Sequence, residues 1–336
     1  MSRPNFAFGA DVSEDNNFIE WPKDGNRIAL LDGDMVPYII GYTISDMTLL
    51  KANTRVKDGQ CASIKDTPEC KNALDRVDSV VNSWVRGADC DAARIFMTDS
   101  ASNFRVNLAF SDPYKGQRKE EKPPFFYEMR EYLIERHKAF LAKGYEADDA
   151  MSIHQWTEAL KFCKENGCEP WGIDHRAFAN TVIVSADKDL MIVPGYHLIP
   201  GEEVTWVEPL GHLELKLKPD GTVKKLKGSG LKFFYAQMVT GDTIDNYKGI
   251  PRKGARAAYD MLAHCKDEKS LYMAVLRAYK EKFGFGKVIL KNYRGGTKEG
   301  TAFDLMLEAG RLAHMAHFEG DIWRADKNPV TWGNEW

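Results

Sequence analysis

Three short apolar runs in this sequence are each followed by aspartate. The runs cover residues 27–31, 94–98 and 181–185, and the aspartates are Asp32, Asp99, and the pair Asp187 and Asp189. Each run has the length and the β-branched or bulky content of a buried strand. In an open α/β sheet the carboxyl ends of parallel strands form the edge where active sites lie. Carboxylates gathered there repel, so some must be protonated or shared by cations, and we predict a site for hard divalent metal ions.

Two further stretches carry closely spaced carboxylates, at the start of one expected helix and in the loop after another: Glu146, Asp148 and Asp149, then Asp242 and Asp245. A solvated helix start explains the first stretch nearly as well as a metal site, because the helix dipole favours acids there. Asp34 is ambiguous, since capping the following helix explains it equally well. No HExxH motif or Cys/His cluster indicates zinc, and no GxxxxGK[ST] loop indicates a nucleotide triphosphatase.

Two basic stretches could contact an anionic polymer. Lys115 and Arg118 would share one face of a helix, and Tyr114 could stack on a base; a solvated charged helix is the alternative. The second stretch is a glycine-containing turn between helices with four basic residues and no acid: Lys248, Gly249, Arg252, Lys253, Gly254 and Arg256. Its backbone N–H groups would suit a DNA phosphate, although an ordinary helix connection is the alternative.

The order of the expected elements predicts two domains. Strands at 27–32, 94–98 and 181–185 alternate with helices at 36–51, 70–87, 125–141 and 144–166, and this β-α-β order favours a parallel sheet. A hairpin at 213–226 and helices at 231–239, 255–265, 270–283 and 301–317 follow. We expect an N-terminal arm at 1–26, an α/β domain at 27–228, a helical domain at 229–322 and a C-terminal tail at 323–336.

The composition is that of an ordinary globular protein and excludes some classes. The 336 residues carry 46 basic and 49 acidic side chains, which argues against a uniformly basic nucleic-acid binder but leaves room for a basic face. The six cysteines form no CxxC pair, so we expect free thiols in a reducing compartment such as the cytoplasm. No apolar run approaches the roughly 20 residues of a membrane span, and the polar N-terminus is no signal peptide.

These stretches together resemble the 5′–3′ exonuclease and flap endonuclease family. The matching pieces occur in family order and are Leu31-Asp32-Gly33, Thr98-Asp99-Ser100, Tyr114-Lys115-Gly116-Gln117-Arg118, Gly144-Tyr145-Glu146-Ala147-Asp148-Asp149, Ser185-Ala186-Asp187-Lys188-Asp189-Leu190 and the run from Val239-Thr240-Gly241-Asp242 through Asp245 to Gly249-Ile250. Stand-alone exonucleases of tailed bacteriophages look most similar, including at residues 311–323. The nuclease domain of bacterial DNA polymerase I looks more distantly related.

The resemblance implies a PIN-like α/β nuclease core with a mainly parallel central sheet, followed by a helix–three-turn–helix region for DNA at about 240–265. It also implies metal ligands in two sets. Asp32, Asp99, Glu146 and Asp148 would hold one ion, and Asp149, Asp187, Asp189 and Asp245 would hold the second, with Asp242 assisting. Lys115 and Arg118 would polarise the scissile phosphate, and Arg105 would contact a phosphate.

The activity that the resemblance implies is a Mg²⁺- or Mn²⁺-dependent 5′–3′ exonuclease on duplex DNA, with 5′-flap cleavage and RNA-primer removal in bacteriophage DNA replication or degradation. Flapped or RNA-primed DNA would be partners, as could a single-stranded-DNA-binding protein or a polymerase, and K⁺ could bind at the turn. A phage-encoded enzyme would act in the host cytoplasm.

Two alternatives remain at this point. A PIN-type ribonuclease is one, although the turn at 249–256 favours duplex DNA. A non-catalytic DNA-binding module is the other, although no acidic position of the family pattern is missing.

The sequence departs from the family pattern at two places. The family turn usually has Gly-Ile-Pro-Gly-Ile-Gly, and here Arg252-Lys253 replaces the inner glycine and its apolar neighbour. That change puts in question the usual backbone geometry of the turn and the binding of a monovalent cation there. Pro123-Pro124 interrupts residues 119–143, where some relatives carry a helical arch.

Overall fold

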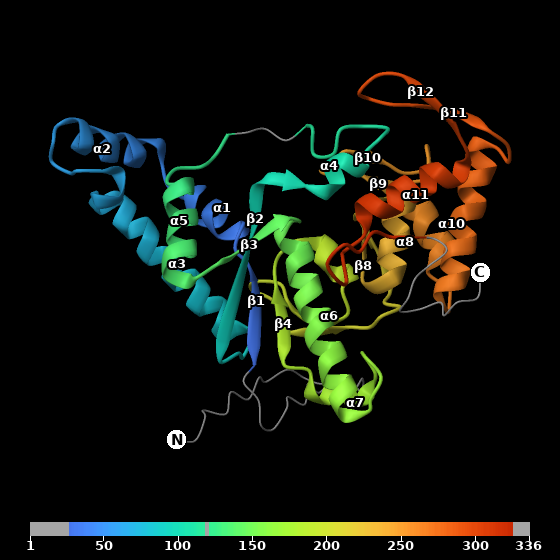
Figure 1. The fold of residues 1–336 in the computed structure, drawn as a ribbon, viewed down its shortest axis with the longest axis horizontal. Helices are drawn as coiled ribbons and strands as arrows, with labels where there is room; N and C mark the ends of the chain where they lie inside the picture. The colour runs from blue at the N-terminus through green and yellow to red at the C-terminus, as the bar shows by residue number, and fades with distance from the viewer. Residues whose placement is uncertain (1–26, 118–120, 325–336) are drawn as a thin grey trace.

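The centre of the molecule is a six-stranded, mainly parallel sheet, shown in Figure 1. The structure is a computed structural model that describes residues 27–117 and 121–324. The strands lie in the order β3-β2-β1-β4-β5-β6, and all neighbours are parallel except β5 and β6. Their bounds are β1 Ile28–Asp32, β2 Ala92–Asn103, β3 Phe140–Gly144, β4 Thr181–Val184, β5 Gly195–Leu198 and β6 Thr205–Val207. The predicted α/β class and mainly parallel sheet are confirmed.

Alternate residues of β1 serve two hydrophobic clusters, one on each face of the sheet. Ala29 and Leu31 join the cluster formed with α1 (Met35–Gly41), α3 (Pro68–Gly87) and α5 (Phe126–His137). Leu30 joins the cluster that contains residues of α6 (Ala147–Asn166). Because successive side chains of a strand point to opposite faces, both faces of the sheet are apolar and are covered by helices. The carboxyl ends of the strands stay uncovered, and a site can form there. The remaining short helices are α2 Asp46–Lys57, α4 Phe104–Leu108, α7 Ile173–Phe178, η1 Ile64–Asp66 and η2 Lys188–Ile192.

A mainly helical region follows the sheet, at the right of Figure 1. The predicted hairpin and all four predicted helices are present. Their bounds, with those of two small further hairpins, are β7 Leu213–Leu217, β8 Val223–Gly228, α8 Gly230–Thr240, β9 Gly241–Asp242, β10 Tyr247–Lys248, α9 Ala255–Leu262, α10 Glu268–Phe283, β11 Val288–Lys291, β12 Thr297–Gly300 and α11 Ala302–Ala313.

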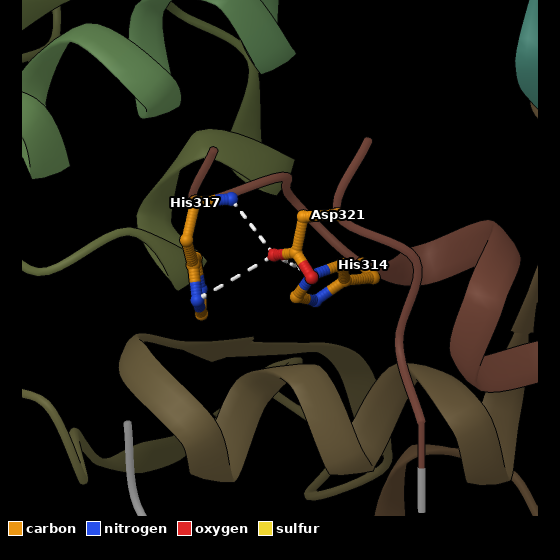
Figure 2. A group of neighbouring side chains, drawn as sticks. All are labelled: His314, His317 and Asp321. Carbon is orange, nitrogen blue, oxygen red and sulfur yellow. Dashed lines mark hydrogen bonds and ion pairs between the residues drawn. The ribbon is translucent and has the colours of Figure 1, made fainter. Parts of the chain in front are cut away.

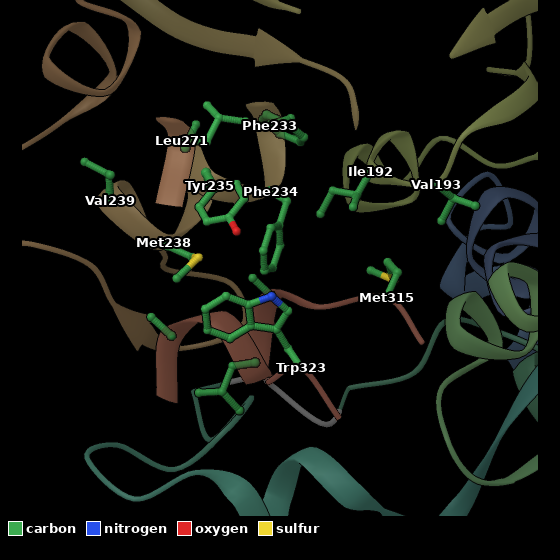
Figure 3. Packing of buried hydrophobic residues seen from close by; sticks show 14 of the residues in the cluster. Ile192, Val193, Phe233, Phe234, Tyr235, Met238, Val239, Leu271, Met315 and Trp323 are labelled. Atoms are coloured by element: carbon green, nitrogen blue, oxygen red, sulfur yellow. The ribbon is translucent and has the colours of Figure 1, made fainter. Parts of the chain in front are cut away.

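One hydrophobic cluster continues from α6 into the helical region. It includes Met151 of α6 and Phe234 of α8, as well as Trp323 beyond α11. Figure 3 shows Trp323 beneath α8, and its ring centroid lies 5.6 Å from that of Phe234. Gly310 leaves room for the indole, because a Cβ there would lie 2.4 Å from it. Trp323, the first residue of the expected tail, therefore belongs to the core. The domain boundary near residue 228 stays a prediction.

Three predicted elements differ in the structure. The helix expected at 36–51 is two helices, because Ser45 caps a new one: its hydroxyl accepts a bond from the Thr48 N–H at 3.3 Å. The helix expected at 125–141 ends at His137, where Lys138 has a φ of 56°, and β3 follows. The strand expected to end at Thr98 continues to Asn103, with an irregular register against β3.

No α-helix in the described part of the chain combines the length and apolar character that a bilayer span requires.

Candidate metal centre

The carboxyl ends of β1 and β4 bring the first carboxylates together. Asp32 is buried at the end of β1 and accepts a hydrogen bond from the Ser185 hydroxyl at 2.9 Å. The same hydroxyl accepts one from the Asp187 N–H, also at 2.9 Å, so Ser185 ties the two strand ends together. Burial, helped by the charges of Asp34 and Asp187, raises the pKa of Asp32 to about 7.

A second group continues along the same edge and joins the helical region. Asp189 lies in η2, and burial together with the charges of Asp187, Asp242 and Asp245 raises its pKa to about 7. The Lys188 ammonium hydrogen-bonds Asp242 and lies 3.6 Å from Asp189. Although burial opposes ionisation of Asp242, Lys188 holds its pKa below the usual value. The turn after α8 therefore contributes two carboxylates to the edge of the sheet.

The third group surrounds the start of α6. Glu146 is buried and accepts hydrogen bonds from Lys115 Nζ and, at 2.7 Å, from the Tyr114 hydroxyl. Tyr114 also contacts Asp245 at 2.9 Å, and Lys115 Nζ lies 3.7 Å from Asp245. Burial disfavours the charge on Glu146, yet Arg105 and Lys115 keep its pKa low. Burial and the neighbouring Glu146 raise the pKa of Asp148.

These carboxylates form one continuous set along the edge of the sheet, which we call the acidic arc. Its members are Asp32, Asp187, Asp189, Asp242, Asp245, Glu146 and Asp148. The arc runs from the parallel strands through the turn after α8 to the start of α6, with Lys115 inside it.

Arg105 lies inside the protein, and its contact with a phosphate stays a prediction. It is 1% exposed, and both terminal nitrogens bond the Asp149 carboxylate, the Nη2–Oδ1 pair at 2.7 Å. Nη1 also bonds Glu146 at 3.2 Å, while Nε and Nη2 donate to the carbonyls of Leu312 and His314. Asp149, expected as a metal ligand, serves here as the counter-ion of Arg105.

Tyr114 is buried as well, and its stacking on a base stays a prediction. Its ring lies under the arc, where its hydroxyl bridges two carboxylates. Lys115 lies in a turn with a φ of 54°, in place of the helix considered above, and its N–H donates to the Asp245 carbonyl at 2.9 Å. Arg118 lies outside the described residues. Asp99 is partly buried within β2, where the strand was expected to have ended.

The glycine-containing turn lies between β10 and α9, and its cations face solvent to different degrees. Arg252 and Arg256 are exposed, Lys253 is partly exposed, and Lys248 pairs with Asp112 at 2.9 Å while its side chain is 80% exposed. Gly249 is tightly packed, because a Cβ there would lie 2.3 Å from the Val239 carbonyl oxygen. Gly254 precedes α9, and a Cβ there would meet nothing within 4 Å.

Arg252 occupies the position where the family usually has glycine, and its φ is 70°. This left-handed backbone geometry costs a residue other than glycine about 1 kcal/mol. A K⁺ ion at this turn stays a prediction of the resemblance.

The donor set of the acidic arc fits hard divalent cations. It offers carboxylate oxygens, the ligands that Mg²⁺ and Mn²⁺ prefer. At one end of the arc, ligand atoms of Glu146 and Asp148 lie within 4.8 Å of each other. Burial first, and neighbouring carboxylates second, raise the pKa of Asp32 and of Asp189, and a divalent cation would offset both effects.

Sequence reasoning missed several residues that organise the arc. Arg130 of α5 donates to Asp34 and, at 2.8 Å, to the Thr98 carbonyl oxygen. Gln237 of α8 donates to Asp189. Lys188 and Ser185 could have been found, since both lie in the acidic motif itself. Arg130 and Gln237 carry no such signal, because helical spacing alone does not say which strand end they reach.

No protein-family model matches the chain. DNA polymerase I of Lactococcus lactis subsp. cremoris (strain MG1363) is 24% identical over 273 residues, 77% of this chain and 27% of that protein. DNA polymerase I of Lactococcus lactis subsp. lactis (strain IL1403) is 26% identical over 223 residues, 63% of this chain and 22% of that protein. The chain thus spans about a quarter of the length of the curated relatives it matches.

Solved structures with a similar fold come from bacteriophage T5. A T5 D15 protein co-crystallised with metal ions aligns with 13% identity and a TM-score of 0.44, covering 85% of this chain and 88% of that one. A T5 5′-exonuclease with bound zinc aligns with 15% identity and a TM-score of 0.39, covering 75% and 88%. The resemblance to DNA polymerase I that the motifs predict is found among the curated relatives as well.

Proposed function

We propose that the protein is a divalent-metal-dependent nuclease that hydrolyses DNA phosphodiester bonds from 5′ ends, on duplex DNA and at 5′ flaps. The observation that carries the proposal is the acidic arc with Lys115 inside it. Seven carboxylates with Lys115 among them at the edge of a parallel sheet suit a reaction on a phosphate, where metal ions and a fixed cation counter developing charge. RNA-primer removal and a role in bacteriophage DNA replication are the finer parts of the proposal.

Two parts of the arc would hold the ions. Asp32 and Asp187, with Asp189, would serve one side, and Glu146 and Asp148 the other. Asp99, Asp242 and Asp245 would act on the ions directly or through water. Bound Mg²⁺ or Mn²⁺ would supply an activated water and stabilisation of the leaving oxygen.

The remaining residues position the substrate. Lys115 would leave its carboxylate partners for a phosphate oxygen once cations neutralise them. The turn from Lys248 to Arg256 would grip the duplex backbone through its cations and through the N–H groups at the start of α9, without reading bases. This turn directly follows the segment that supplies Asp242 and Asp245, so the expected DNA contacts lie next to the acidic arc in the sequence.

The experiment is cleavage of 5′- and 3′-labelled duplex, flap and RNA–DNA hybrid substrates, with Mg²⁺ or with chelator. We expect release of 5′ label first, and no cleavage in chelator. Asp187→Asn keeps the size of the side chain and removes its charge. Cleavage should fall by at least about three orders of magnitude, as when groups that act as a unit are lost.

Duplex affinity of Asp187→Asn should be kept or improved, because repulsion of the phosphate falls. Asp260→Asn, an exposed change on α9, is the matched control and should cut normally. Full cleavage by folded Asp187→Asn, or undiminished cleavage in chelator, would sink the proposal.

A further inference from the structure

A second group of potential metal ligands lies outside the acidic arc, in the segment after α11. Figure 2 shows His314, His317 and Asp321 turned toward one another. His314 Nε2 lies 2.8 Å from Asp321 Oδ2, and His317 Nδ1 lies 3.7 Å from the same oxygen. One ligand atom of each residue lies within 4.8 Å of the other two. Three side chains from an eight-residue segment thus converge on one point.

The chemistry of these ligands differs from that of the arc. Burial, helped by the neighbouring His314, lowers the pKa of His317 to about 3. Burial opposes ionisation of Asp321, yet the hydrogen bonds from the His314 ring and from the His317 N–H hold its pKa below the usual value. Two imidazoles and one carboxylate suit Zn²⁺, whereas Mg²⁺ prefers oxygen ligands and water.

The hydrogen bonds within this group use one of the two carboxylate oxygens of Asp321. The contacts of Asp321 with His314 and with the His317 N–H both use Oδ2. Among the described residues no hydrogen bond reaches Oδ1. The 3.7 Å between His317 Nδ1 and Asp321 exceeds a hydrogen bond, so this nitrogen faces the carboxylate without bonding it. The His317 ring is held in this position against Trp156, with centroids 4.3 Å apart.

We propose that His314, His317 and Asp321 bind one zinc-type transition-metal ion, with water as a fourth ligand. The ion would replace the proton between His314 Nε2 and Asp321 Oδ2. His317 Nδ1 would move closer to that point and bind the ion as well. The site would be structural, because its segment supports the arc from behind: the His314 carbonyl accepts a bond from Arg105, and the Ala316 N–H donates to Asp149 at 3.2 Å. The proposal is independent of the nuclease activity.

The test is Zn²⁺ binding to metal-stripped protein in a large excess of Mg²⁺, which fills oxygen sites and competes poorly for imidazole. We expect one Zn²⁺ per chain that Mg²⁺ does not displace. Co²⁺ in its place should give the strong visible absorption of a four-coordinate site, and Zn²⁺ should raise the melting temperature.

His317→Phe keeps a ring against Trp156 and removes the ligand atom, and Asp321→Asn keeps the shape of the carboxylate. Both variants should lose the Mg²⁺-resistant Zn²⁺ and the Co²⁺ spectrum. His264→Phe removes an exposed histidine, and Asp187→Asn alters the arc; both should bind Zn²⁺ as the wild type does. If wild type holds no Mg²⁺-resistant Zn²⁺, or if folded His317→Phe and Asp321→Asn hold as much as wild type, the three residues are a hydrogen-bonded cluster only and the proposal is overturned.

Discussion

Lys115 lies among carboxylates at the point where the sheet edge meets the helical region. Its ammonium bonds Glu146 and lies near Asp245, and its side chain is 20% exposed. A cation held in this way can move a short distance to a phosphate without first being ordered. Its positive φ fixes the direction in which the side chain leaves the turn.

Lys115→Ala should lower the single-turnover cleavage rate by about two orders of magnitude, because losing one donor to the transition state costs roughly 3 kcal/mol. Duplex affinity should change little. Lys65→Ala, which removes a surface lysine paired with Glu131, is the control and should be silent. A normal rate with weaker binding would reassign Lys115 to electrostatic attraction of DNA.

The acidic arc should also link metal binding to pH. Folding raises the pKa of Asp32 and Asp189 from 3.8 to about 7, so the metal-free folded protein holds protons that the unfolded chain has lost. These two groups therefore destabilise the metal-free protein as pH rises from about 4 to about 7. Mg²⁺ must displace the protons, so its apparent affinity should rise up to about tenfold per pH unit for each carboxyl, and level off above about 7.

The measurement is the free energy of unfolding in Mg²⁺ minus that in chelator, from pH 5.5 to 8.5. The subtraction removes groups that do not touch the ion. One of them is buried His197, whose low pKa of about 4 makes stability fall as pH drops from about 6.5 in both conditions. A difference that is flat with pH would contradict the assignment of Asp32 and Asp189 to the metal centre.

At the residue scale, the sequence predicted the members of the arc better than their supports. An aspartate after a buried run is visible locally, because strand periodicity fixes which residues are buried. The pairing of Arg105 with Asp149 is not visible, since Asp149 lies 44 residues further along the chain and the carbonyl groups of Leu312 and His314, which also bond Arg105, lie 207 and 209 residues further along. Arg105 and Tyr114 were expected on the surface because an Arg or Tyr side chain alone does not indicate a buried polar cluster.

At the element scale, the turn between β10 and α9 contains one glycine that is packed against the backbone and one that is accessible to solvent. Gly249 is enclosed by the backbone of the preceding helix end, and Gly254 opens to solvent. The two glycines of one turn therefore serve different purposes, although the sequence pattern treats them alike.

Gly249→Ala should reduce the free energy of unfolding by several kcal/mol, because its Cβ would lie 2.3 Å from one backbone atom and 2.4 Å from another. Gly254→Ala should leave stability within about 0.5 kcal/mol, since nothing lies within 4 Å and the backbone there suits alanine. Its methyl group should nonetheless weaken duplex binding by obstructing the start of α9. The measurements are urea unfolding and duplex affinity in chelator. Undiminished affinity of Gly254→Ala would show that DNA does not approach this backbone closely.

Long periodic elements could be predicted from the sequence, and short ones could not. The apolar positions of α3 repeat at helical spacing over 20 residues, and the prediction is confirmed almost to the residue. Strand β3 was taken as the end of a helix, because five residues carry too few positions to distinguish a period of two from 3.6. Strands β5 and β6 were missed for the same reason, with four and three residues.

At the scale of the whole molecule, the cluster around Arg105 joins three distant parts of the chain. It links α4 to the start of α6 and to the segment after α11, beneath the arc. A buried charge pair of this kind is weak evidence for stability, but removing one partner leaves the other uncompensated.

Arg105→Met should therefore lower the free energy of unfolding by roughly 3–5 kcal/mol, because Asp149 and Glu146 lose their cation. Adding Asp149→Leu should recover much of that loss. Arg55→Met breaks the more exposed pair with Glu69 and should cost about 1 kcal/mol or less. Denaturant unfolding of the four proteins measures the effect, and a cost near that of Arg55→Met would contradict the role of Arg105.

The cluster around Arg105 can form only late in the synthesis of the chain. A chain grows from its N-terminus, and its early domains generally fold first. Here Asp242 and Asp245 emerge from the ribosome well after the strands they face, and the carbonyl groups that hold Arg105 emerge later still. An unfinished chain would lack the support of Glu146 even with every carboxylate present. If the protein has the nuclease activity proposed above, it would stay inactive during its own synthesis.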